Sequence, residues 1–264
     1  MGLFSNFLLA TGISDNAKIE AVFYNESVRQ GGELTGVIQL TGGSINIDFN
    51  GIFLEIEAEY VEEEDGELHV KSAVIDELEL SGEFTLDEES LVELPFSIRL
   101  PRNIPITAKI ILSKEDRSTL YLKTILKVPM ADDPSDADKI VIYPSKNLEC
   151  VLIALTRNMD FQLTETNSIL YKEEIIQEFE FKPNPDSPYA SFLEELECFF
   201  LHEEDGLKVY MEIDRRARNF TTAFLEVLDL DETFKSVFID ADTLKAGPDA
   251  VAELLDSLVN EYAE

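Results

Sequence analysis

Alternation of apolar and polar residues with a period of two is the dominant pattern along the chain. The clearest run spans 52–60, where apolar residues from Ile52 to Tyr60 alternate mostly with glutamates. The same alternation recurs over 94–100 and 207–214. Because successive side chains of a strand point to opposite faces, each run predicts a strand with one packed and one solvated face. The chain is therefore expected to be mainly all-β, with antiparallel sheets.

Turn-forming dipeptides separate these runs, among them Asn50-Gly51, Asp65-Gly66 and Asp205-Gly206. Short strands with turn signals about every ten residues are typical of β-sandwiches. Asp65-Gly66 and Asp205-Gly206 each end an acidic tetrapeptide, which predicts two acidic hairpin tips. Asn50-Gly51 lies inside an apolar run, so it predicts either a tight turn or a strand bend.

A length of 264 residues is enough for two domains of ordinary size. We place the boundary at Pro144, with the acidic segment 130–138 as the alternative. This choice predicts an N-terminal sandwich over 1–143, a C-terminal sandwich over 144–242 and a tail over 243–264.

Two helices are predicted in the second half. Ser145 is a suitable N-cap for the apolar stripe that follows it. A terminal helix begins at Gly247-Pro248, and its apolar face includes Leu254, Leu255, Leu258 and Tyr262. This face can either pack on its own domain or serve as a detachable segment that binds a partner.

The charge of the chain narrows the choice of partners. Its 54 acidic and 21 basic residues give a formal net charge of -33, which repels nucleic acid and anionic lipid. Two cysteines are too few for a secreted disulfide framework, and no lysine or arginine precedes Lys18, so we predict a cytoplasmic location. The apolar N-terminal residues Leu3, Phe4, Phe7 and Leu8 are expected to cap a sandwich rather than rest on a membrane.

Candidate catalytic chemistry is sparse. His69 and His202 are expected at exposed strand edges, and no nucleophile elbow or phosphate-binding glycine loop occurs in the sequence. We predict no catalytic residue, no cofactor and no zinc site. Weak calcium binding at acidic loops stays open, with oxygen ligands from Asp132, Asp133, Asp136, Asp138, Asp229, Asp231 and Glu232.

A basic cluster stands out in this acidic chain. Arg215, Arg216 and Arg218 follow Asp214 at the end of a predicted strand. Guanidinium groups pair well with carboxylates, so the cluster is either an internal clamp or a surface that docks a partner.

Several stretches resemble the arrestin-like sporulation-control (SpoOM) family of bacteria. In the first half they are Ser27–Gly36, Thr41–Ser44, Asn50–Leu54 and Leu94–Pro101; in the second half they are Gln177–Phe181, Leu193–Glu197 and Glu212–Arg218. The resemblance is weak between Ile106 and Asp133 and in the final helix. It implies a pair of arrestin-like β-sandwiches that regulate through protein contacts, without catalytic residues.

Two classes of function are compatible with the sequence. The first is a non-enzymatic regulatory or scaffold protein whose partners are other proteins, with a homodimer as one option. The second is a β-sandwich ligand-binding module, or a hydrolase that uses paired carboxylates. A concave pocket with two desolvated carboxyl groups would favour the second.

Overall fold

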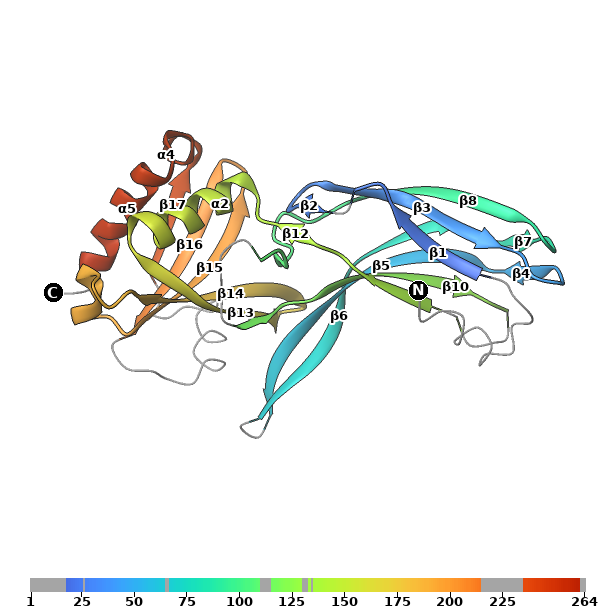
Figure 1. Cartoon of the computed structure of the whole chain (residues 1–264), viewed down its shortest axis with the longest axis horizontal. Helices are drawn as coiled ribbons and strands as arrows, with labels where there is room; N and C mark the ends of the chain where they lie inside the picture. Colours follow the sequence, from blue (N-terminus) through green and yellow to red (C-terminus); the bar gives the residue numbers. More distant parts are fainter. Residues whose placement is uncertain are drawn as a thin grey trace.

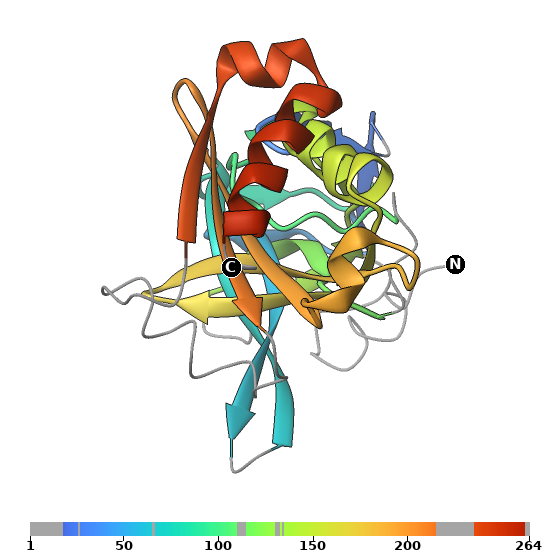
Figure 2. The same cartoon turned by 90° about the vertical axis from the view of Figure 1, so that its left-hand side faces the viewer.

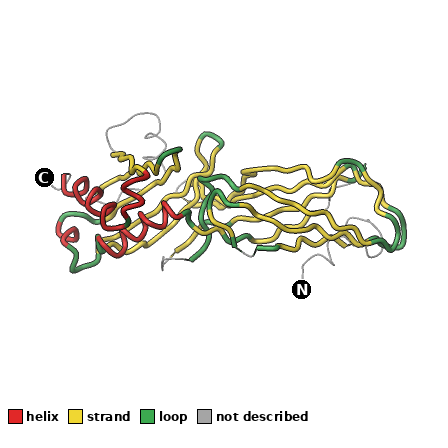
Figure 3. Tube along the Cα trace, turned by 90° about the horizontal axis from the view of Figure 1, so that it is seen from above, coloured by secondary structure: helices red, strands yellow, loops and turns green. Residues whose placement is uncertain are grey.

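The computed structural model describes residues 18–25, 27–64, 67–109, 115–129, 133, 135–214 and 235–261. The two halves of the chain lie end to end in an elongated molecule (Figure 1). Seen from above, strands run along its whole length, and helices gather at the end formed by the second half (Figure 3).

Two sheets enclose the core of the first half. One has the strand order β1-β3-β8 and the other has the order β11-β10-β5-β6, and all neighbours in both are antiparallel. Two short pairs, β4 with β7 and β2 with β12, accompany them. The strands are β1 (Lys18–Phe23), β2 (Val28–Arg29), β3 (Glu33–Thr41), β4 (Ile47–Phe49), β5 (Gly51–Glu64), β6 (Glu67–Ser81), β7 (Phe84–Leu86), β8 (Leu91–Arg99), β10 (Leu120–Lys127), β11 (Ser135–Lys139) and β12 (Ile142–Tyr143).

The predicted alternation in β5 is confirmed. Ile52, Leu54 and Ile56 are fully buried between the two sheets, and the residues between them are partly exposed. Gly51 makes a strand bend between β4 and β5, with a φ of 152°. A β-carbon at this position would lie 2.8 Å from the carbonyl oxygen of Ser81, so the bend requires glycine.

The second half is built on one six-stranded sheet of order β17-β16-β15-β14-β13-β9. Helices α2, α4 and α5 cover one face of this sheet (Figure 2). The elements are β9 (Glu115–Arg117), α2 (Lys146–Ile153), the π-helical turn η2 (Ala154–Asn158), β13 (Phe161–Tyr171), β14 (Glu174–Pro183), the 3-10 turn η3 (Pro188–Ser191), β15 (Glu195–Glu203), β16 (Gly206–Asp214), β17 (Lys235–Asp240), α4 (Ala241–Ala246) and α5 (Pro248–Glu261).

Large apolar side chains fill the space between this sheet and its helices. Phe179 and Phe181 of β14 are buried against Leu148 and Val151 of α2 and Leu255 of α5, all in one hydrophobic cluster. Among the described residues, the second layer of this half therefore consists of the helices α2, α4 and α5 and not of another sheet.

Both predicted helix starts are confirmed. The backbone N–H of Leu148 donates to Ser145 Oγ at 3.0 Å, so Ser145 is the N-cap of α2. The terminal helix α5 begins at Pro248, directly after Gly247, whose φ is 105°.

One segment of the first half crosses to the second. β9 pairs in parallel with β13, and Ile106 belongs to the hydrophobic cluster of the second half. The units 1–143 and 144–242 and the tail 243–264 stay predictions. The segment between β8 and β10 crosses from the first unit to the second.

Candidate functional site

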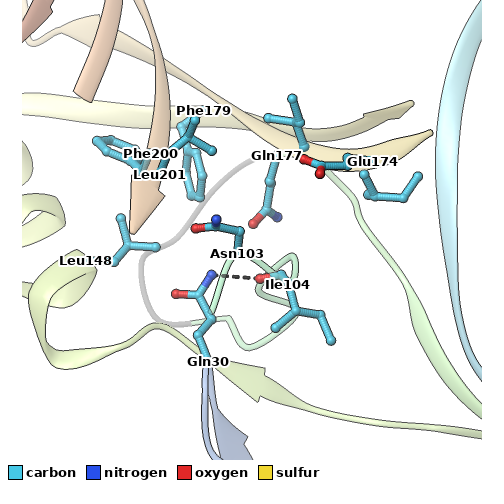
Figure 4. Close-up of a pocket in the computed structure, with 11 residues that line it drawn as sticks. Gln30, Asn103, Ile104, Leu148, Glu174, Gln177, Phe179, Phe200 and Leu201 are labelled. Atoms are coloured by element: carbon cyan, nitrogen blue, oxygen red, sulfur yellow. Dashed lines mark hydrogen bonds between the residues drawn. The ribbon is translucent and has the colours of Figure 1, made fainter. Parts of the chain in front are cut away.

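The two halves meet at a joint that polar side chains bridge by hydrogen bonds. A cavity of about 30 Å³ lies within it and is lined by Gln30, Asn103, Ile104, Leu148, Glu174, Ile175, Ile176, Gln177, Phe179, Phe200 and Leu201. Figure 4 shows Gln30 and Gln177 reaching in from opposite sides. A space of this size suits a single water molecule rather than a substrate.

Gln177 of β14 carries the first set of contacts across the joint. Its amide oxygen accepts the backbone N–H of Ile106 at 2.8 Å, and its amide nitrogen donates to the Ile106 carbonyl at 2.9 Å. The same nitrogen donates to Ser118 Oγ at 3.0 Å. A buried side chain thus satisfies both backbone groups of Ile106, which holds the crossing segment against the second sheet.

Gln30 and Arg29 carry a second set. Gln30 donates to the carbonyl of Ile104 at 2.7 Å and accepts the backbone N–H of Ser145 at 3.1 Å. Arg29 donates to the carbonyl of Pro144 at 2.7 Å and pairs with Glu149 of α2 at 2.8 Å. These bonds fix the start of α2 against the end of β2.

Asn103, His202 and Ser145 form the third set. His202 Nε2 lies 2.6 Å from Ser145 Oγ, and His202 Nδ1 lies 3.2 Å from Asn103 Oδ1. Asn103 Oδ1 can only accept, so Nδ1 carries the proton and Nε2 accepts from the serine hydroxyl. His202 is half-buried rather than exposed at a strand edge, because both of its ring nitrogens form contacts within the joint.

Ser145, His202 and Asn103 are linked in the same sequence of hydrogen bonds as a catalytic triad, but the histidine lacks the charged partner that a triad has. Burial of the ring, with a smaller contribution from the charge of Arg102, lowers the pKa of His202 to about 4. A base of this kind is weak, and Asn103 offers no negative charge to stabilise an imidazolium. Ser145 Oγ also accepts the N–H of Leu148 as the helix cap. The geometry therefore suits a set of hydrogen bonds between neutral side chains that joins the two halves.

The half-buried His202 predicts a dependence of the free energy of unfolding on pH. The pKa of His202 is about 4 in the folded chain and 6.5 as its ordinary value, so between these values only the unfolded chain binds the proton. The contribution of His202 to the free energy of unfolding is therefore complete above pH 6.5, and it is lost as the pH falls to 4. Allowing for partial solvent screening, we expect a loss of about 2 kcal/mol, measured by urea unfolding at a series of pH values.

His202→Gln should flatten this part of the pH profile. The matched control is His69→Gln, because His69 is the other histidine of the chain and lies exposed on β6. Equal slopes for wild type and His202→Gln between pH 4 and 6.5 would contradict the assignment.

The outer face of the second sheet carries a row of glutamates that sequence reasoning missed. Glu178 and Glu180 of β14 and Glu195 and Glu197 of β15 are all buried. Burial raises the pKa of Glu178 to about 8, and burial together with the charge of Glu178 raises that of Glu197 to about 9. Both groups are therefore mainly neutral at pH 7.

The pKa shifts of Glu178 and Glu197 are not those of the acid and base of a hydrolase. Such an enzyme requires one ionised and one protonated carboxyl group, which means environments that push the two pKa values apart. Glu178 and Glu197 both shift upward, and burial is the first cause for each. Neither lines the cavity at the joint.

Three of the acidic positions considered for calcium, Asp133, Asp136 and Asp138, lie within the described residues. Asp133 pairs with Lys127 at 2.7 Å, whereas Asp136 and Asp138 lie within strand β11. Within the described ranges, no group of three or more suitable side chains could hold a metal ion. The other candidates, Asp132, Asp229, Asp231 and Glu232, lie outside the described residues.

The remaining predicted site residues are placed in part. Asp214 ends β16 and pairs in register with Glu195 of β15. Several predicted residues lie outside the described ranges: Arg215, Arg216, Arg218, Leu3, Phe4, Phe7, Leu8 and Tyr262. Leu255 of α5 is buried in the core of the second half, and Leu254 and Leu258 are partly buried against it. A partner-docking role for the tail would require α5 to leave this core, and it stays a prediction.

No helix in the described part of the chain is long and apolar enough to cross a membrane.

Comparison with known proteins covers almost the whole chain. The family model described as SpoOM protein matches residues 4–217. The sporulation-control protein Spo0M of Bacillus subtilis (strain 168) is 30% identical over an alignment of 269 residues that covers 100% of each chain. The crystal structure of that protein from B. subtilis superposes with a TM-score of 0.82 at 28% identity, covering 94% of this chain and 100% of the other.

The comparison confirms the predicted fold class, mainly all-β and arrestin-like, and the predicted family. With a family model that spans most of its length and a relative aligned from end to end, the chain belongs to the SpoOM protein family.

Proposed function

We propose that this protein is a regulator of sporulation that acts in the cytoplasm through contacts with other proteins and not as an enzyme. The observation that carries the proposal is its end-to-end similarity to the B. subtilis sporulation-control protein. The family alone does not distinguish a contact mechanism from catalysis, so the chemistry of the joint supplies the second argument.

Three properties of the joint favour a contact mechanism. The cavity accommodates about one water, the His202 ring is a weak base, and the Ser145 hydroxyl is occupied by His202 and by the cap of α2. Cys150 and Cys198 are free thiols, which is compatible with a reducing cytoplasm.

Complementation tests this proposal. The full chain is expressed in B. subtilis that lacks its own Spo0M, and heat-resistant spores are counted. We expect spore counts to move toward those of the parent strain. A chain that is expressed and folded but leaves the counts unchanged would overturn the sporulation role.

Ser145→Ala separates the two mechanisms in the same assay. The substitution removes the hydroxyl that any Ser–His chemistry would need, at a cost of about 1 kcal/mol for the lost helix cap and about 1 kcal/mol for the lost bond to His202. A contact regulator should keep its complementing activity. Loss of complementation by this folded variant would instead support catalysis.

A further inference from the structure

The end of the β5–β6 hairpin projects away from both halves of the molecule (Figures 1 and 2). β6 is an edge strand of the four-stranded sheet, and within the described ranges it pairs with β5 alone. Its residues 67–70 are exposed on both faces of the strand. An edge strand of this length presents a row of backbone donors and acceptors that another strand can meet.

An apolar row lies along the same part of β6. Leu68, Val70 and Val74 are 53%, 65% and 51% exposed, and their even spacing places them on one face of the strand. Soluble proteins usually protect a projecting edge with charges or proline, because exposed β-branched residues there invite pairing. Here apolar residues occupy positions 68, 70 and 74 of the edge, and Ser72 lies between the last two.

The negative charge around this apolar row limits which strands can pair with β6. Residues 55–79 contain eleven acidic residues and one lysine, Lys71. Lys71 is held by ion pairs to Glu62 and Glu64 across the hairpin, and hydrogen bonds to these two carboxylates raise its pKa. Its charge is therefore neutralised within the hairpin, and the surface left to a partner is acidic.

A second copy of this chain is a poor occupant, because its hairpin would bring the same excess of acidic residues to the interface, four of them on β6 itself. Like charges on neighbouring strands are destabilising, whereas a basic strand would be attracted. The basic side chains of such a strand would lie on the face that carries Glu62, Glu64 and Glu67, where three carboxylates outnumber the single lysine, Lys71.

We propose that β6 binds an extended segment of a partner protein as an added strand, with alternating apolar residues against Leu68, Val70 and Val74 and with lysine or arginine between them. This proposal rests on the proposed contact function and names the surface that performs it. Strand addition to an exposed edge supplies affinity through main-chain hydrogen bonds and specificity through alternate side chains.

A defined peptide tests the proposal on the full chain. The probe is a labelled peptide of about ten residues in which valine and lysine alternate. One control peptide has glutamate in place of lysine, and another has two central prolines, which keep the charge but prevent strand pairing. Binding is followed by fluorescence anisotropy, and hydrogen exchange locates the protected amides.

We expect the valine–lysine peptide to bind and to protect amides of β6, and both control peptides to bind at least about tenfold more weakly. Val70→Glu should weaken binding by about tenfold or more, and Leu68→Glu provides a second variant in case the first does not fold. The matched control is Leu91→Glu, since Leu91 is 65% exposed on β8, an edge strand of the other sheet.

Three results would overturn the proposal: equal binding of the proline peptide, equal weakening by Leu91→Glu, or no protection in β6. Concentration-dependent dimers with protected β6 amides would assign the edge to a second copy and overturn it as well. Complementation separates the two proposals. If Val70→Glu restores sporulation as wild type does, the β6 surface is wrong and the regulatory function stands; if wild type fails, the function itself is wrong.

Discussion

Replacing Gln177 with Leu is expected to lower the free energy of unfolding by about 3 kcal/mol, which is a large share of the stability of a protein of this size. Leucine has a similar volume but no amide, so the backbone N–H and carbonyl of Ile106 lose their partners at 2.8 Å and 2.9 Å. Ile106 is only 8% exposed, so water cannot readily replace the amide. Urea unfolding followed by circular dichroism measures the change.

The same substitution at Gln39 is the control. Gln39 donates to Glu93 at 2.8 Å, but this bond lies at the surface, where water can take the place of the amide. We expect Gln39→Leu to change the free energy of unfolding by less than about 0.5 kcal/mol. Similar losses for the two variants would mean that Gln177 does not hold the crossing segment in solution.

Calorimetry adds a readout specific to the joint. If Gln177 couples the two halves, weakening it should let them unfold at separate temperatures, because each half has its own hydrophobic cluster. A single transition that shifts without broadening would indicate that the remaining contacts of Gln30 and His202 are sufficient for coupling.

Strands and helix starts could be predicted from the sequence where they depend only on neighbouring residues. The period-two runs identify β5, β8 and β16, because a strand with one buried face imposes its pattern on consecutive residues. The helix starts at Ser145 and Pro248 were equally accessible, since a cap or a first-turn proline acts within one turn.

The joint could not be predicted because its partners are distant in sequence. Asn103 and His202 are 99 residues apart, and Gln177 and Ile106 are 71 residues apart. One signal was available: Gln177 is a polar residue in phase with the buried Phe179 and Phe181. A polar side chain on the apolar face of a strand indicates a buried group that has a hydrogen-bond partner. The pattern does not show which residue that partner is.

The row of buried glutamates illustrates a second limit. Alternation of Glu178 and Glu180 with phenylalanine predicts a solvated polar face, and the strands do form as expected. The raised pKa values of Glu178 and Glu197 arise from burial and from carboxylates on neighbouring strands, which depend on tertiary structure. Sequence pattern fixes which side of a strand a residue occupies, but not how deeply that side is covered.

Leu255→Ala is expected to lower the free energy of unfolding by about 3 kcal/mol. The side chain is fully buried in the cluster between α5 and the second sheet, so its removal loses apolar burial and leaves a cavity. Thermal or urea unfolding measures the effect. Glu253→Ala is the matched control on the same helix, because Glu253 is exposed, and we expect a change within about 0.5 kcal/mol.

This pair of variants also decides between the two interpretations of the C-terminal helix. A docked helix transmits the loss at Leu255 to the stability of the whole second half, since Leu244 of α4 and Val151 of α2 share its cluster. A helix that is mostly detached would make Leu255→Ala as mild as Glu253→Ala. That outcome would favour Leu254, Leu258 and Tyr262 as a partner-docking face, because their apolar side chains would then be exposed in the free protein.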